Sequence, residues 1–187
     1  MNCNNFKTQI DYESTFIENN SSLIKNITAS DFISDYTRSD FDLFAGIDLS
    51  VASNRKVRGL ALRIRRPKYE KWNKNFTISG HINKPNSQIK VILNSIENNA
   101  CYPHLVLQIN GVDNDGSCIK AKAILIESNV LAKYIMHLID LKELNLYYEQ
   151  KIDAYEFNFY EIFEKLETGV KIFGIKDNYI YYEISNS

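Results

Sequence analysis

The strongest constraint on the fold is a strict alternation of apolar and polar residues in two neighbouring segments. In segment 45–51, Ile47, Leu49 and Val51 alternate with Gly46, Asp48 and Ser50, and the same period of two resumes over 57–66. Successive side chains of a β-strand point to opposite faces, so this pattern predicts two half-buried strands joined by a turn at 52–54. On the second strand one face carries Leu60, Leu62 and Ile64, and the other carries Ala61, Arg63 and Arg65.

The rest of the chain divides into segments of helical and strand period. Apolar residues at helical spacing predict helices at 11–27, 30–36, 89–96, 128–138 and 161–167. Alternation or apolar runs predict strands at 76–79, 104–109, 118–126, 155–160, 171–176 and 179–184. A hairpin turn is expected at 113–116 (Asp-Asn-Asp-Gly). We therefore expect an α+β fold with a mixed central sheet flanked by helices: a core over 1–140, and an aromatic-rich extension over 141–187 packed on it.

Charge is strongly segregated along the chain. Residues 55–74 hold nine Lys or Arg against one acid, a net charge of +8, whereas the other 167 residues carry −9. A concentrated positive face indicates binding of nucleic acid, DNA or RNA. The candidate contact residues are Lys56, Arg58, Arg63, Arg65, Arg66, Lys68, Lys71, Trp72 and Lys74. Alternatively, these basic side chains form a solvated face and pair with acids elsewhere in the chain. For Trp72 the alternative to base stacking is a packing role.

Several classes of protein are disfavoured by the composition. The cysteines, Cys3, Cys101 and Cys118, form no CxxC pair and with the scattered histidines supply no zinc site. Seven glycines form neither a Walker A loop nor a dinucleotide-binding motif. No apolar run has the length of a membrane helix, and the first residues lack an apolar secretory segment, so we expect a cytoplasmic protein with no membrane partner.

The order of helix, acid-bearing strand, turn and basic strand resembles the core of the PD-(D/E)XK, or restriction-endonuclease-like, nuclease superfamily. In that family an acid opens the second strand and a Glu/Gln-X-Lys motif lies on the third. Here Gly-Ile-Asp-Leu at 46–49 matches the acid-bearing strand, and Leu-Arg-Ile-Arg-Arg at 62–66 occupies the place of the other motif. The resemblance covers roughly residues 10–140. It implies a metal-dependent endonuclease and a role in restriction, repair or phage–host conflict.

The resemblance assigns a role to each matching residue. Asp48 would be the catalytic acid that holds Mg²⁺, helped by Asp42 or by Glu13 on the preceding helix. Arg65 would replace the lysine that orients phosphate and water. Arg63 stands where the family has its second acid, and a guanidinium is always protonated and cannot ligate a metal. The resemblance thus implies either a diverged Mg²⁺-dependent nuclease or an inactive descendant that still binds nucleic acid.

Independently of the resemblance, the positions of Arg63 and Arg65 favour phosphate binding. They lie about 7 Å apart on one strand face, and each can form a bidentate pair with phosphate oxygens. A second hypothesis is a protein-interaction module, an inhibitor or accessory subunit, whose basic face docks an acidic partner. The tyrosines of the last 41 residues favour a protein partner or a homodimer interface beside their role in the core.

Overall fold

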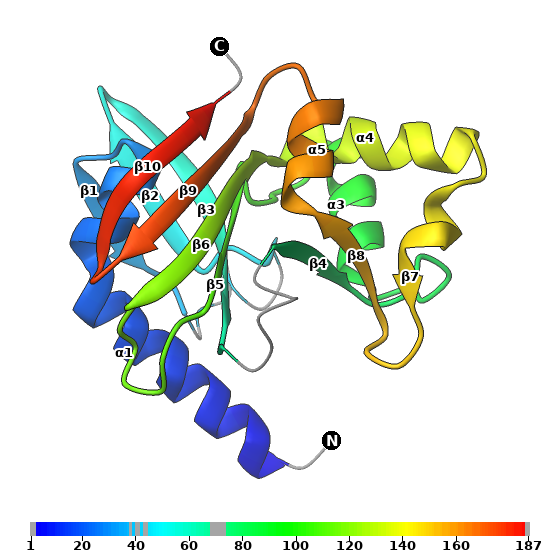
Figure 1. Cartoon of the computed structure of the whole chain (residues 1–187). Coiled ribbons are helices and arrows are strands. Elements are labelled where there is room, and N and C mark those ends of the chain that lie inside the picture. Colours follow the sequence, from blue (N-terminus) through cyan, green and yellow to red (C-terminus); the bar gives the residue numbers. More distant parts are fainter. Residues whose placement is uncertain (1–2, 38, 40–41, 43–44, 68–73, 186–187) are drawn as a thin grey trace.

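The computed structural model describes residues 3–37, 39, 42, 45–67 and 74–185. Its larger sheet contains, in spatial order, β1 (Phe32–Asp35), β2 (Leu49–Ser53), β3 (Lys56–Arg65), β5 (Leu105–Asn110), β6 (Lys120–Glu127), β9 (Val170–Lys176) and β10 (Tyr179–Ser185). A smaller sheet contains β4 (Asn75–Ser79), β8 (Ala154–Asn158) and β7 (Tyr148–Glu149). The helices are α1 (Cys3–Thr28), α3 (Gln88–Glu97), α4 (Ser128–Asp140), η2 (Leu144–Tyr147) and α5 (Phe159–Lys165) (Figure 1).

The larger sheet is mixed, which confirms the expected α+β class. The strands β1, β2 and β3 pair in antiparallel fashion, and β3 then pairs in parallel with β5. A parallel pair needs a crossover connection, which β4 and α3 provide here. The strands β5, β6, β9 and β10 continue the sheet as antiparallel neighbours.

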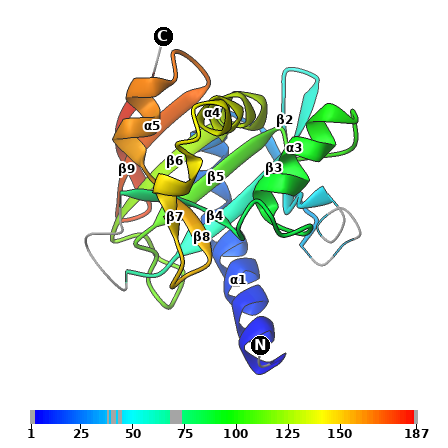
Figure 2. The same ribbon diagram turned by 90° about the vertical axis from the view of Figure 1, so that its right-hand side faces the viewer.

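Two apolar cores lie on the two faces of the larger sheet. On one face α1 buries Phe16, Ile24 and Ile27 against the strands. On the other face the smaller sheet, α3, α4 and α5 form a second cluster. Figures 1 and 2 show α1 on one side of the larger sheet and these elements on the opposite side. The apolar side of β3 therefore faces α1, while the side that carries Arg63 faces the smaller sheet.

One expected element is wrong. Segment 30–36 was predicted to be a helix, but it contains strand β1. Its backbone pairs with β2, with Ile33 opposite Val51, and the Tyr36 amide donates to the Asp48 carbonyl at 2.8 Å. Helix-compatible local spacing is outweighed here by hydrogen bonds to a strand that is distant in sequence.

The first predicted strand is also displaced. Strand β2 begins at Leu49, not at residue 45, and the turn lies at Asn54 and Arg55, both with positive φ. Gly46 has a φ of +64°, a conformation that favours glycine. The chain therefore turns before the strand, and Asp48 lies at the entrance of β2.

The remaining expected helices and strands are present, with boundaries shifted by a few residues and α1 extended toward the N-terminus. The 141–187 segment contributes to both sheets. Strand β8 pairs with β4, and β9 lies between β6 and β10. In the part of the chain that the structure describes, no helix has the length and apolar character needed to span a membrane.

Candidate nucleic-acid-binding cleft

An open cleft of about 1100 Å³ lies where α1, the entrance of β2, β3 and the start of α3 meet. It is lined by Glu13, Asp42 and Asp48 on one side and by Arg63, Ser79 and Gln88 on another. The three acids predicted from the sequence and one of the two strand arginines thus share one site. These residues come from segments separated by up to 75 positions in the chain, so only the tertiary fold brings them together.

Asp48 is the central acid of the cleft. Its Oδ2 atom accepts a hydrogen bond of 2.5 Å from the Leu62 amide, which fixes the carboxyl group against β3. Burial raises the pKa of Asp48 to about 8, against the lowering effect of the Leu62 hydrogen bond. Asp42, which shares a hydrogen bond with Asp48, and the charge of Glu13 raise this pKa further. Negative charge at Asp48 is therefore costly unless a proton or a cation accompanies it.

The chemistry of these acids fits a hard divalent cation. In the described residues no three acid, His or Cys side chains are grouped to hold a metal ion. However, Mg²⁺ commonly binds through one or two carboxylates together with water and substrate phosphates. Asp42 and Asp48 are in contact and could supply such a pair, and Glu13 adds negative charge. A bound Mg²⁺ would neutralise charge on a phosphodiester and activate water.

Arg63 faces the same cleft from β3. Its guanidinium donates hydrogen bonds to the Ser79 hydroxyl at 3.3 Å and to the Gln88 side-chain carbonyl. Burial and the charge of Arg65 lower the pKa of Arg63 to about 10, while Asp48 and Glu13 raise it. Arg63 therefore stays charged at neutral pH, next to the acids and held by the opposite wall.

Arg65 has a different position from the one expected. It points to the same side of β3 as Arg63, but its Nη2 atom donates to Thr77 at 2.6 Å on β4, and it does not line the cleft. On this face of β3 the cleft is instead lined by Arg63, two residues before Arg65, and by Ala61. Of the two strand arginines, only Arg63 thus lines the cleft.

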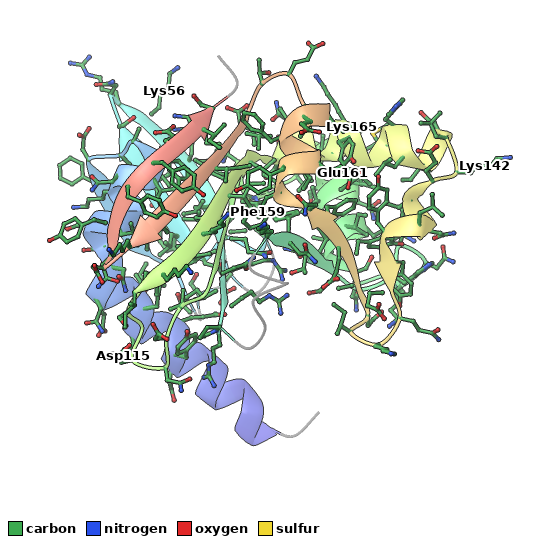
Figure 3. The ribbon with its side chains drawn as sticks, in the orientation of Figure 1. Lys56, Asp115, Lys142, Phe159, Glu161 and Lys165 are labelled. Carbon is green, nitrogen blue, oxygen red and sulfur yellow. The ribbon has the colours of Figure 1, made fainter. Side chains whose placement is uncertain are left out.

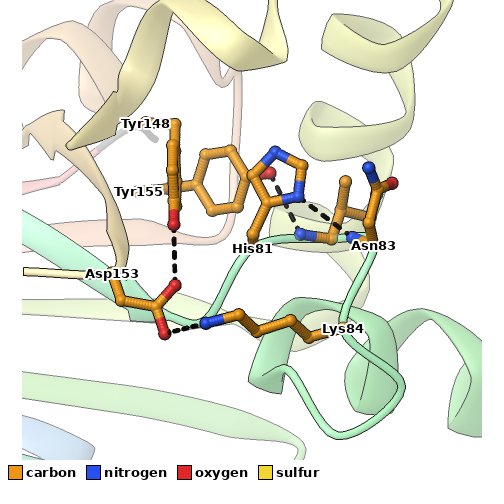
Figure 4. Close-up of polar contacts among 7 residues, drawn as sticks. His81, Asn83, Lys84, Tyr148, Asp153 and Tyr155 are labelled. Atoms are coloured by element: carbon orange, nitrogen blue, oxygen red, sulfur yellow. Dashed lines mark hydrogen bonds and ion pairs between the residues drawn. The ribbon is translucent and has the colours of Figure 1, made fainter. Parts of the chain in front are cut away.

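The outer wall of the cleft is the loop between β4 and α3, and it is tied to the smaller sheet (Figure 4). The Lys84 ammonium contacts Asp153 at 2.5 Å, and the Tyr148 hydroxyl donates to the same carboxylate at 2.7 Å. The His81 ring packs edge-on against Tyr148 at 4.6 Å and is stacked on Tyr155 at 5.9 Å. Sequence reasoning missed this wall, because its partners come from the C-terminal quarter of the chain.

No known protein family matches this chain, and no curated protein matches it in sequence. The chemistry of the cleft is therefore inferred from its own residues.

The other predicted contact residues of the basic block, the segment 55–74, lie in different parts of the structure. Lys56 lies at the outer tip of the β2–β3 hairpin (Figure 3), and Arg58 lines a separate small cleft with Tyr102 and His104. The Arg66 guanidinium lies 4.5 Å from the centre of the Tyr12 ring, on the α1 side of the sheet. Lys74 is exposed beside β4. The predicted contacts Lys68, Lys71 and Trp72 lie outside the described residues.

Proposed function

We propose that this chain binds nucleic acid in the Asp48–Arg63 cleft, as a diverged metal-dependent nuclease of the restriction-endonuclease-like type. One observation carries the proposal. Glu13 on α1, Asp48 at the entrance of the second strand and Arg63 on the third strand converge on one cleft. The family resemblance also implies an acid at the second strand and a phosphate-orienting cation on the third, although it gave the role of that cation to Arg65 and not to Arg63.

Each residue of the cleft has a role in this proposal. Arg63 binds a phosphate of the nucleic-acid backbone, because its planar guanidinium can donate two parallel hydrogen bonds. Ser79 and Gln88 hold this side chain in position. Asp42 and Asp48 hold the divalent cation. Because Arg63 takes the role that the resemblance gave to Arg65, the place of the family's second acid moves from Arg63 to Ala61, and Asp42 and Glu13 would supply the missing negative charge.

The test is fluorescence anisotropy with labelled DNA and RNA over a range of salt concentrations. Arg63→Gln is expected to weaken binding at least tenfold, because a charge-assisted hydrogen bond contributes about 1.5–3 kcal/mol. Arg63→Lys retains the charge and should bind more tightly than Arg63→Gln. Circular dichroism confirms that each variant is folded. Absence of binding by the wild-type chain at low salt would overturn the proposal and would direct the search to an acidic protein partner.

Cleavage is tested with Mg²⁺ or Mn²⁺ on the same oligonucleotides. We expect metal-dependent cleavage by the wild-type chain that is lost in Asp48→Asn, while Arg58→Gln, outside the cleft, cleaves normally. Binding without cleavage by the wild-type chain would identify it as an inactive descendant that retains only the phosphate site.

A further inference from the structure

A second cluster of polar and aromatic side chains lies on the same face of the larger sheet as Arg63. Strand register places Arg65 opposite Asn110, Asn110 opposite Lys122, Lys122 opposite Gly174, and Gly174 opposite Tyr182. Directly opposed residues of neighbouring strands point to the same face, so these five form one row across the sheet. With strands about 4.8 Å apart, the row is roughly 19 Å long.

Lys122 is the central cation of this row. Its ammonium donates to the Tyr160 hydroxyl at 2.8 Å and lies 5.1 Å from the centre of that ring. Within the described part of the chain, no acidic side chain forms a salt bridge with Lys122. A half-buried lysine that is matched by a phenol instead of a carboxylate keeps its positive charge available to an anion.

The absence of a side chain at Gly174 makes room for two tyrosines. A Cβ atom at this position would lie 1.9 Å from Cε1 of Tyr182 and 2.5 Å from Cζ of Tyr181. The pairing of β10 with β9 shifts by one residue between Ile180 and Tyr182, which is a β-bulge. A bulge redirects side chains, and here it brings Tyr181 to the same glycine as Tyr182.

These tyrosines are accessible beside the cation. Tyr181 is 58% exposed, and its ring meets that of Tyr182 edge-to-face at 4.5 Å. Lys122 and Tyr160 are partly exposed. In Figure 1, α5 lies to the right of the upper end of β9. The surface thus offers an ammonium group, phenol hydroxyls and an exposed aromatic ring.

We propose that Lys122 of this row and the neighbouring Tyr181 bind a single-stranded segment of the nucleic acid that occupies the cleft. The inference rests on the proposed function. Lys122 contacts a backbone phosphate, and Tyr181 stacks on a base, the combination that single-strand-binding surfaces use. Next to Arg65 in the row, Asn110 is buried and donates to the Asn75 carbonyl of β4 at 3.0 Å, so the accessible part of the row is the end with Lys122. A duplex presents its bases already stacked and cannot use Tyr181 in this way.

The structural alternative is that Lys122 only ties β6 to α5 through Tyr160. If Lys122 has only that role, replacing Tyr181 should not change nucleic-acid binding, because the exposed ring of Tyr181 contributes little to the fold. Variants of the two residues therefore distinguish the readings. Lys133 on α4 and Tyr179 on β10, both exposed, serve as matched controls.

The experiment is fluorescence anisotropy of the full chain with a labelled, unstructured single strand of about 12 nucleotides and with a blunt duplex. Lys122→Gln should weaken single-strand binding about fivefold and reduce the log–log salt slope by about 0.7, the value of one phosphate contact. Tyr181→Ala should weaken it at least fivefold. Duplex binding should change less than twofold, and Lys133→Gln and Tyr179→Ala should bind like the wild type.

The outcomes separate this inference from the function on which it rests. If the wild-type chain binds and Arg63→Gln weakens binding, but Lys122→Gln and Tyr181→Ala do not, the cleft is supported as the binding site and the single-strand site at Lys122 and Tyr181 is wrong. Equal losses for Lys122→Gln and Lys133→Gln would also overturn it, because they would indicate a diffuse effect of charge. If the wild-type chain binds no nucleic acid, both proposals fall.

Discussion

Asp48 shows how a partly buried carboxyl group can titrate near neutral pH. Its carboxyl is held by the Leu62 amide, lies against Asp42, and has its pKa raised to about 8. In the unfolded chain an aspartate has a pKa near its usual value of about 4. Between these two values the folded chain binds a proton that the unfolded chain does not.

This difference predicts a pH dependence of stability. As the pH rises from about 4 to about 8, the free energy of unfolding should fall, because ionisation of Asp48 is easier in the unfolded chain. Asp48→Asn removes this dependence and should be more stable than the wild type at pH 8, by on the order of 1–3 kcal/mol. Urea denaturation of both proteins in chelator, at about pH 5 and pH 8, measures it. A constant difference between the two proteins would contradict the raised pKa of Asp48 in the folded chain.

At the scale of elements, buried amides join the layers. Gln108 on β5 is fully buried, and its side chain accepts from the Thr77 amide at 3.0 Å and donates to the Asn75 carbonyl at 2.7 Å. It therefore fixes β4, which leads to the cleft wall, to the larger sheet. Asn20 in α1 similarly donates to the carbonyls of Phe16 and Gly116 at 3.0 and 2.8 Å, where the helix has a non-helical φ of −123°.

Gln108→Leu should destabilise the chain by about 2–4 kcal/mol, because the Thr77 amide loses its acceptor and the Asn75 carbonyl keeps only the Asn110 amide as a side-chain donor. The measurement is the midpoint of chemical denaturation. Gln150→Leu, in an exposed turn, is the control and should change stability by less than about 0.5 kcal/mol. A similarly small effect of Gln108→Leu would mean that water replaces the lost contacts.

Asn20→Ala should cost about 1–2 kcal/mol, since it removes the link from the α1 kink to the β5–β6 loop. Hydrogen exchange of the 113–117 backbone should also become faster. Asn26→Ala, at an exposed position of the same helix, is the matched control. If exchange in this loop were unchanged, Asn20 would have no role in holding it.

At the scale of the whole molecule, the basic block is not a single surface. Strand β3 is about 30 Å long, so Lys56 and Arg58 lie at the opposite end from Arg65. Arg66 lies on the other side of the sheet, at Tyr12. A net charge of +8 in the sequence is thus divided among separate parts of the surface, and the cleft contains only some of it.

This division predicts the outcome of a charge reversal. The double variant Lys56→Glu/Arg58→Glu should weaken nucleic-acid binding less than twofold, whereas Arg63→Gln weakens it at least tenfold. Anisotropy titrations at one fixed, low salt concentration compare the two proteins. A larger effect of the double variant than of Arg63→Gln would move the binding surface to the hairpin tip and away from the cleft.

Local periodicity in the sequence was enough to predict the main elements around the cleft. The alternation over 57–66 and the helical spacing over 11–27 led to β3 and α1, and they separated the apolar side of β3 from the side with Arg63. The sequence also singled out Asp48, Asp42, Glu13 and Arg63. Only the tertiary structure decided that these four share a cleft and that segment 30–36 is a strand. The hydrogen bonds of Arg65 to Thr77 and of Lys122 to Tyr160 also depend on the tertiary structure. Periodicity reflects which side of an element is buried, whereas convergence of side chains depends on hydrogen bonds and packing between segments far apart in the chain.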